Sequence, residues 1–145
     1  MRLCLNPTPA TTPAIVSALK AAGLYVIDLD DYERVILGRE MFLAAFAELT
    51  QETFMDLSYI SRAHCCLDRI VDPNASSCLR LVTDLSYNGT RLNGIRIERA
   101  IPYRLQHGQL LEVLPWKLGY IVDDDETDSE FLPMPEMADV EQANT

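Results

Sequence analysis

The sequence predicts an all-β fold, either a sandwich or a barrel. From residue 56 onward, short β-branched or alternating segments follow one another at close spacing. Turn signals separate these segments, namely Asp72-Pro73-Asn74, Asn88-Gly89, Asn93-Gly94, His107-Gly108 and Pro115. Several short strands at such spacing are typical of sandwiches and barrels. A chain of 145 residues with 48% apolar content is long enough for one domain with a real core.

The first third of the chain mixes strands with helices. Residues 2–5 are expected to form a first strand, and residues 24–29 and 33–37 two more. Residues 11–23 (TTPAIVSALKAAG) predict a short helix, because a Thr precedes a Pro in the first turn and a Gly follows the apolar stripe. Residues 40–49 (EMFLAAFAEL) also have a helical stripe. Both helices are interpreted as insertions between strands.

The second part of the chain supplies the remaining predicted strands. Their sequences are short and end at the turn signals. We expect strands at 64–71 (HCCLDRIV), 78–85 (CLRLVTDL), 91–97 (RLNGIRI), 109–114 (QLLEVL) and 117–122 (KLGYIV).

Charge is unevenly distributed along the chain. Residues 1–122 hold 13 acidic and 12 basic side chains, a net charge of −1, whereas residues 123–145 hold 9 acids and no base. We therefore predict a nearly neutral domain over 1–122 and a disordered acidic tail over 123–145. A neutral body is unsuited to binding nucleic acid, which requires a basic face. Ten of the 12 bases are Arg, which suits bidentate binding of carboxylate or phosphate.

Membrane, redox and metal signals are weak. The chain has no apolar run of about 18 residues and no signal-peptide pattern at its start, so neither membrane partner nor secretion is expected. The four cysteines form no CxxC pair, which favours free thiols in a reducing intracellular compartment. A zinc site from His64, Cys65, Cys66 and Cys78 would fit none of the common ligand spacings. We therefore expect no metal and no cofactor.

Four motifs occur in a fixed order and carry the functional signal. They are LGRE (37–40), SRAH (61–64), DLSYNGTRLNG (84–94) and LQHGQLLEV (105–113). Each of the short ones is common alone, but the third is long and specific, and the ordered set is more specific still. The set resembles the forkhead-associated (FHA) domain, a phosphothreonine-binding module. The resemblance spans about 75 residues, from Leu37 to Val113.

The resemblance implies the architecture and a function. It implies a sandwich of two antiparallel sheets with the binding site in loops at one end, and an FHA domain with an N-terminal extension within residues 1–122. It implies phosphorylation-dependent protein–protein interaction without catalysis. A nuclear or cytoplasmic location and a role in the DNA damage response or cell cycle are also implied by the resemblance alone.

The phosphate group of phosphothreonine requires several fixed donors, because it carries about −1.5 to −2 charges and three acceptor oxygens. Arg39 follows a predicted strand and Gly38, which lets the backbone turn tightly, and its guanidinium can bind two phosphate oxygens. Ser61 offers a small hydroxyl donor. Arg62 adds a second cation beside it.

The Asn-Gly pair at 88–89 is interpreted as part of a recognition loop. The carboxamide of Asn88 can bond both backbone groups of an extended peptide. Gly89 permits a positive φ, and Thr90 can lock the loop through its hydroxyl. Tyr87 lies where the family's loop lines the γ-methyl of phosphothreonine. The competing interpretation of Asn88-Gly89 is an ordinary type I′ hairpin turn.

The remaining residues of the motifs are given structural roles. The resemblance implies that His64 braces the loop by hydrogen bonds. Asn93 and Gly94 are interpreted as a plain hairpin turn, although the resemblance implies that the Asn also helps hold the loop. A hydrolase that uses Ser61 and His64 is a rival, but the chain has no Gly-x-Ser-x-Gly elbow and no evident third partner.

Selectivity and regulation form a last group of expectations. Tyr59 and Arg91 are candidates for reading the residue three positions after phosphothreonine. The 21 residues between Arg39 and Ser61 include the helix-like stretch 40–49, which either covers a sheet edge or is an extra docking surface. Thr127, with an acid three residues later, looks like an acidophilic kinase site. Its phosphorylated form would occupy either the domain's own pocket or that of a neighbouring copy, and the second case is self-association.

A second reading of the whole chain remains open. A degenerate FHA scaffold would bind a protein partner without phosphate, through the 40–49 helix or an apolar sheet face. Replacement of Arg39 separates the two, because only the phosphate reader depends on that guanidinium.

Overall fold

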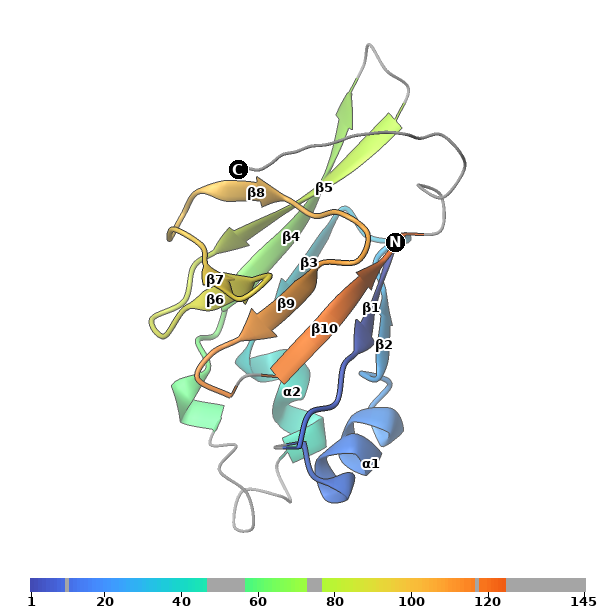
Figure 1. The fold of residues 1–145 in the computed structure, drawn as a ribbon, viewed down its shortest axis with the longest axis vertical. Helices are drawn as coiled ribbons and strands as arrows, with labels where there is room; N and C mark the ends of the chain where they lie inside the picture. The colour runs from blue at the N-terminus through green and yellow to red at the C-terminus, as the bar shows by residue number, and fades with distance from the viewer. Residues whose placement is uncertain (10, 47–56, 73–76, 117, 125–145) are drawn as a thin grey trace.

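The computed structural model describes residues 1–9, 11–46, 57–72, 77–116 and 118–124. Within these ranges the chain forms two antiparallel β-sheets and two short α-helices, so the predicted sandwich is confirmed. Figure 1 shows one sheet in front of the other, with both helices gathered at one end of the sandwich. Within the described ranges no helix is long and apolar enough to cross a membrane.

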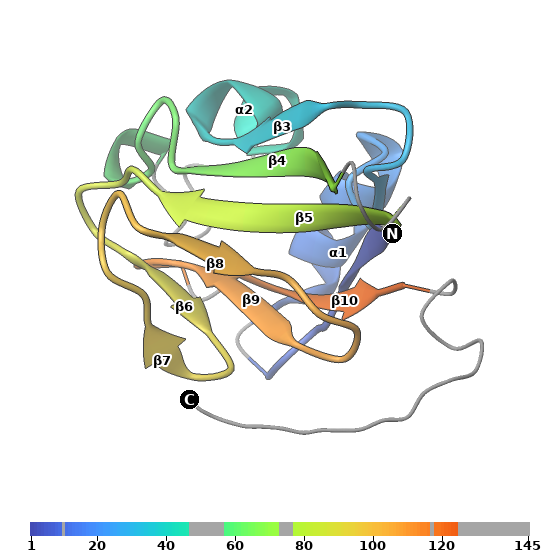
Figure 2. The same ribbon diagram turned by 90° about the horizontal axis from the view of Figure 1, so that it is seen from above.

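Sheet A, as we name the larger sheet, contains six strands among the described residues. In spatial order they are β2 (Val26–Asp28), β1 (Arg2–Leu5), β10 (Leu118–Asp123), β9 (Leu110–Val113), β6 (Thr90–Leu92) and β7 (Ile95–Arg96). Sheet B contains four strands, which Figure 2 shows side by side. They are β3 (Arg34–Leu37), β4 (Cys65–Asp72), β5 (Ser77–Asp84) and β8 (Pro102–Arg104).

The N-terminal segment is an integral part of sheet A. β1 pairs with β2 on one side and with β10 on the other. Leu3 and Leu5 project from β1 into the core, where both are buried. The hydroxyl of the buried Tyr120 donates to the carbonyl of Leu24 at 2.7 Å. The first thirty residues therefore complete the same core as the motif-bearing segments.

The two helices were predicted with nearly correct bounds. Helix α1 covers Pro13–Ala21, and its N-cap Thr12 accepts a hydrogen bond from the backbone N–H of Ile15 at 3.3 Å. Helix α2 covers Arg39–Phe46, so it begins one residue before the predicted stretch 40–49, whose last three residues lie outside the described ranges.

Helix α2 packs at the end of the sandwich. Phe42 and Phe46 are fully buried, and both rings meet Trp116 edge-on, at centroid distances of 5.7 and 5.1 Å. Trp116 lies between β9 and β10, so the helix closes the end of the core instead of extending a sheet edge. Its exposed apolar side chain is Leu43.

Several local expectations differ from the structure. Strand β8 and the 3₁₀ turn η1 (Leu57–Tyr59) were not predicted, because each is only three residues long. Residues 91–97 form two short strands around a turn. The predicted tail starts too early, since Asp123 is the last residue of β10. The rest of the predicted tail, with Thr127, lies outside the described ranges.

Candidate functional site

Three sequence-predicted side chains meet around one short backbone segment, Tyr59–Ser61. Arg39 donates from its backbone N–H to the carbonyl of Ser61 at 3.1 Å, and from Nε to the carbonyl of Ile60 at 3.0 Å. Asn88 donates from Nδ2 to the carbonyl of Tyr59 at 2.7 Å. The structure thus brings a guanidinium, a hydroxyl and a carboxamide from three distant segments to one end of the sandwich.

Gly38 explains how Arg39 comes so close to that segment. Gly38 joins β3 to α2, and a Cβ at this position would overlap the carbonyl oxygen of Arg62 and lie 3.1 Å from that of Ser61. Only glycine leaves room for the two backbones to pass. Arg39 follows as the first residue of the helix, so its side chain is fixed by the start of α2.

The hydroxyl of Ser61 holds the start of the Asn88 loop. Its Oγ accepts the backbone N–H of Tyr87 at 3.0 Å. Because that contact uses a lone pair, the hydroxyl proton of Ser61 remains available to donate. The side chains of Tyr87 and Tyr59 are exposed, by 89% and 53%, and Arg62 is exposed too. These three side chains form the rim of the candidate site.

His64 is a fully buried residue that ties three loops together. Its backbone N–H donates to the carbonyl of Leu37 at 2.9 Å. Its Nε2 lies 2.7 Å from the carbonyl of Gly89, and its Nδ1 accepts from the backbone N–H of Ser61 at 3.4 Å. The Nε2–H tautomer satisfies both contacts. Burial lowers the pKa of His64, against the opposing effects of the Gly89 carbonyl and Asp84.

The same contacts bear on the hydrolase alternative. A general base must reach the proton of its nucleophile. Both ring nitrogens of His64 contact backbone groups, and among the described residues neither is hydrogen-bonded to Oγ of Ser61. The local geometry is that of a brace within a loop.

A second brace underlies the Asn88 loop; sequence reasoning expected the Thr90 hydroxyl to lock this loop but missed the roles of Asp84 and Ser86. Asp84 is buried, and its Oδ1 accepts from the Ser86 N–H, the Ser86 hydroxyl and the Thr90 hydroxyl, at 3.1, 2.6 and 2.8 Å. The Ser86 hydroxyl oxygen in turn accepts the backbone N–H of Gly89 at 2.7 Å. We call these residues the Asp84 brace. The Asp-x-Ser spacing in DLSYNGT was the signal available for it.

Two arginines that were not among the candidate residues also lie against this loop. The guanidinium of Arg96 lies so close to Gly89 that its Nε would be 2.6 Å from a Cβ there. Arg99 donates from Nε to the carbonyl of Ser86 at 3.1 Å. Both lie between the third and the fourth motif, so neither belongs to a motif.

The second Asn-Gly pair forms the tight turn between β6 and β7. Asn93 and Gly94 both have positive φ, 54° and 80°, which is the type I′ pattern. The Asn93 Oδ1 also accepts from the backbone N–H of Leu110 at 2.8 Å, which ties the turn to β9. Arg91 lies within β6, opposite Glu112 of β9, and is therefore a strand residue.

The cysteines are dispersed. Cys65 starts β4 opposite Asp84, whereas the exposed Cys78 pairs with Val71 near the far end of the same hairpin. Burial raises the pKa of the Cys65 thiol, which disfavours its thiolate. Within the described ranges, no three His, Cys, Asp or Glu side chains gather in a way that could hold a metal ion.

Comparisons with known proteins agree with this architecture. No curated protein sequence matches the chain. The MEK1 FHA domain is 26% identical, with a TM-score of 0.50 over 66% of this chain and 74% of that one. Yeast Pml1, a splicing factor, is 22% identical, with a TM-score of 0.51 over 68% and 69%. An FHA domain of an Arabidopsis thaliana hypothetical protein is 16% identical, with a TM-score of 0.52 over 94% and 88%.

The sequence model of the FHA domain provides the family assignment. It matches residues 35–113, which include Arg39, the Tyr59–Ser61 segment and both Asn-Gly pairs. That range is more than half of the chain, and the solved structures share its two-sheet fold. The protein therefore belongs to the FHA domain family, whose members bind phosphothreonine peptides.

Proposed function

We propose that this protein binds phosphothreonine peptides through Arg39, Ser61 and Asn88 and so mediates phosphorylation-dependent interactions between proteins. The main support is that the side chains of Arg39 and Asn88 both bind the Tyr59–Ser61 backbone, next to the hydroxyl of Ser61. That hydroxyl in turn accepts the backbone N–H of Tyr87, beside Asn88. Arg39 and Ser61 supply N–H and O–H donors for phosphate oxygens. The Oδ1 of Asn88 accepts no hydrogen bond from any described residue, so it is positioned to accept a backbone N–H of the peptide.

The exposed rim determines what else the peptide touches. Tyr87 lies next to Asn88 in sequence and is positioned to pack on the γ-methyl of phosphothreonine. Arg62 adds positive charge beside the phosphate. Tyr59 and Arg91 are proposed to contact residues that follow the phosphothreonine, Tyr59 from the Tyr59–Ser61 segment and Arg91 from strand β6.

The energy of such a site supports moderate affinity. Two or three charge-assisted hydrogen bonds contribute about 1.5–3 kcal/mol each. Part of this is lost when the peptide and the exposed side chains become ordered. Contacts of the peptide with the rim add to these bonds, and we expect a micromolar dissociation constant, which corresponds to about −8 kcal/mol.

The direct test is calorimetry with a phosphothreonine peptide library, each member paired with its unphosphorylated form. Arg39→Ala should weaken phosphopeptide binding at least tenfold. Arg104→Ala is the matched control, because it removes the same charge from sheet B, away from the loops. Equal affinity for phosphorylated and unphosphorylated peptides, unaffected by Arg39→Ala, would instead identify the phosphate-independent scaffold.

Thr127 adds a regulatory proposal, namely that its phosphorylated form binds the site of another copy. β10 begins beside the site, since Leu118 pairs with Val113 and Val113 with Thr90, and it leads away for about 17 Å. Thr127 is four residues beyond Asp123, a reach of about 14 Å at most. A return of Thr127 to its own site would require an almost fully extended segment antiparallel to β10, so we propose the site of a second copy.

Light scattering on the phosphorylated chain tests this proposal. Phosphorylation of Thr127 should raise the mass of the wild type but not that of Arg39→Ala. Thr127→Ala treated with the same kinase is the control for phosphorylation elsewhere. An unchanged mass, together with unchanged chemical shifts at Asn88, would reject self-association by this route. A role in the DNA damage response or the cell cycle stays a prediction, to be tested by which phosphoproteins bind.

A further inference from the structure

The outer face of sheet B forms an ordered pattern of side chains. Directly paired residues of an antiparallel sheet point to the same side. One row of paired residues, Val35, Leu67 and Val82, is buried in the core. The neighbouring rows therefore point outwards, and we call them the outer face. They are Arg34–Asp68–Leu81–Arg104, Ile36–Cys66–Thr83–Pro102 and Ile70–Leu79.

Much of this face is apolar and open to solvent. Ile36 and Ile70 are 42% and 45% exposed, and Leu79 and Leu81 are partly exposed. Aliphatic side chains over neighbouring strands are typical of a surface that binds another protein. None of the residues assigned to the phosphate site belongs to this face.

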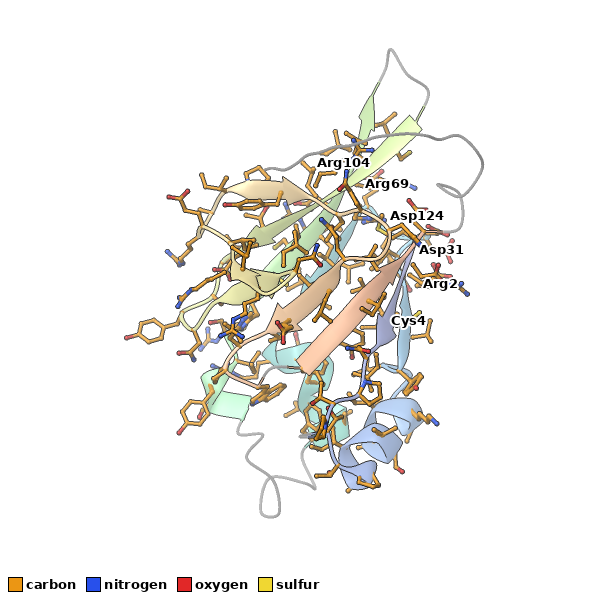
Figure 3. The ribbon with its side chains drawn as sticks, viewed as in Figure 1. Arg2, Cys4, Asp31, Arg69, Arg104 and Asp124 are labelled. Atoms are coloured by element: carbon orange, nitrogen blue, oxygen red, sulfur yellow. The ribbon has the colours of Figure 1, made fainter. Side chains whose placement is uncertain are left out.

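The middle row gives the face a specific charge pattern. Asp68 of β4 pairs with Arg34 of β3, with Nε of the arginine 2.6 Å from Oδ1. Leu81 of β5 follows, and Arg104 of β8 ends the row. Arg104 is exposed and makes no hydrogen bond or ion pair with any described residue. Figure 3 shows Arg104 on the part of the sandwich remote from both helices.

We propose that two copies of this chain stack their outer faces about a two-fold axis parallel to β5. β4 and β8 each lie one strand spacing, about 4.8 Å, from β5. Rotation about that axis places Leu81 against Leu81 of the second copy. It also places Asp68 of each copy opposite Arg104 of the other. The pattern is thus complementary to itself, as a two-fold interface requires.

Other stackings of two copies lack this match. A two-fold axis across the strands sets Asp68 against Asp68 and Arg104 against Arg104, which is repulsive. An axis midway between β4 and β5 sets Arg34 against Arg104. The chosen overlap is three strands wide, about 14 Å. This is smaller than a standard protein interface, so the dimer forms in a concentration-dependent manner.

Such a dimer would join two phosphopeptide sites, because the loops at the end of each sandwich stay outside the interface. A partner that carries two phosphothreonines would then bind more tightly than one with a single mark, through the higher effective concentration of the second site. The dimer itself needs neither phosphate nor peptide, so it can be tested separately from the proposed function.

Sedimentation equilibrium on the full, unphosphorylated chain without peptide is the test. The mass should rise from 16.3 kDa towards twice that value with concentration. Asp68→Lys and Arg104→Glu should each weaken dimerisation at least tenfold. An equimolar mixture of these two variants should restore it, since each interface contact then joins opposite charges. Glu98→Lys, an exposed charge reversal outside the face, should behave as the wild type, and thermal melts verify that all variants are folded.

Three outcomes would overturn the proposal. A wild type that keeps a mass of 16.3 kDa at millimolar concentration has no such dimer. A mixture that associates no better than its two components shows that Asp68 and Arg104 do not face each other. A monomer in which Leu81→Lys shifts the amide resonances of residues 131–137 indicates that the chain's own C-terminal segment occupies the face.

Discussion

The Nε2 of His64 lies 2.7 Å from the carbonyl oxygen of Gly89, and both groups are buried. This hydrogen bond joins the segment before β4 to the loop before β6, and therefore connects the Ser61 and Asn88 sides of the candidate site. A neutral imidazole is required, because Nδ1 accepts the backbone N–H of Ser61.

Acid should destabilise the fold through His64. Burial lowers the pKa of His64 in the folded protein, whereas the unfolded chain has the ordinary value of about 6.5. The unfolded state therefore binds more protons as the pH falls below about 6.5, and the free energy of unfolding decreases. Urea unfolding between pH 7.5 and 5 should show a steeper loss for the wild type than for His64→Gln. Identical slopes would contradict a buried neutral His64.

Removal of the Asp84 brace should loosen the recognition loop. Asp84→Ala leaves three buried donors without an acceptor, which costs about 3 kcal/mol or more. Asp84→Asn keeps an oxygen and should cost less. Urea unfolding measures the loss of stability. Phosphopeptide titration should show weaker binding for Asp84→Ala even at temperatures where this variant is folded. Asp31→Ala removes an exposed carboxylate and should change neither stability nor phosphopeptide binding. An Asp84→Ala variant that is as stable as Asp31→Ala would argue against the Asp84 brace.

Gly38 should be far less replaceable than a glycine that only needs a left-handed φ. Gly38→Ala drives a methyl group into the Arg62 carbonyl, so we expect about 3 kcal/mol or more of destabilisation and loss of phosphopeptide binding. Gly108 has a φ of 88° and open space around it, so Gly108→Ala should cost about 1–2 kcal/mol and leave binding intact. Chemical denaturation of both variants measures the loss of stability, and calorimetry measures the loss of phosphopeptide binding.

Arg80 should matter for stability and not for peptide binding. Its buried guanidinium donates to four backbone carbonyls, those of Leu29, Tyr32, Glu33 and Leu67. Arg80→Met should cost about 3 kcal/mol by leaving these acceptors unpaired. Proteolysis should then begin in the segment between β2 and β3. A fall in phosphopeptide affinity larger than twofold would show that this end of the sandwich is coupled to the loops.

Tyr87 should contribute selectivity for phosphothreonine over phosphoserine. One buried methyl group is worth about 0.8 kcal/mol, roughly a fourfold preference. Tyr87→Ala should reduce that preference towards equality while the phosphoserine affinity stays nearly constant. Paired titrations with peptides that differ only in this methyl measure the ratio. An unchanged ratio would remove Tyr87 from the contact.

The strand pattern predicted a sandwich or a barrel, and the resemblance of the four ordered motifs to the FHA domain implied the sandwich and the clustering of Arg39, Ser61 and Asn88. Asn93-Gly94 adopts the positive φ angles that an Asn-Gly turn favours. Gly38 was expected to permit a tight turn, but the structure shows that it is needed for the close approach of the Arg62 carbonyl. The bracing by His64 was implied by the resemblance, whereas the role of Asp84 and Ser86 was harder to foresee. Asp84 and Ser86 act through side-chain bonds across a loop, and only the folded backbone shows which donors the carboxylate meets.

Arg80 shows a second limit of sequence-based prediction. It lies in CLRLVTDL between two leucines, so alternation alone assigns the apolar positions to the core. The actual register turns Arg80, Val82 and Asp84 inwards and leaves Leu79 and Leu81 partly exposed. Four carbonyls that come from other segments make this orientation favourable, and these partners are not visible from strand periodicity.

Because Arg39 and Asn88 are anchored on the carbonyls of Tyr59–Ser61, the specificity of peptide recognition can evolve only in limited ways. A substitution that moves this tripeptide should displace Arg39, Ser61 and Asn88 together, so intermediate grades of binding should be rare. Double variants among Arg39, Ser61 and Asn88 should accordingly lose less binding free energy than the sum of their single effects. New specificities are therefore expected to arise on the rim, where side chains can vary independently of one another.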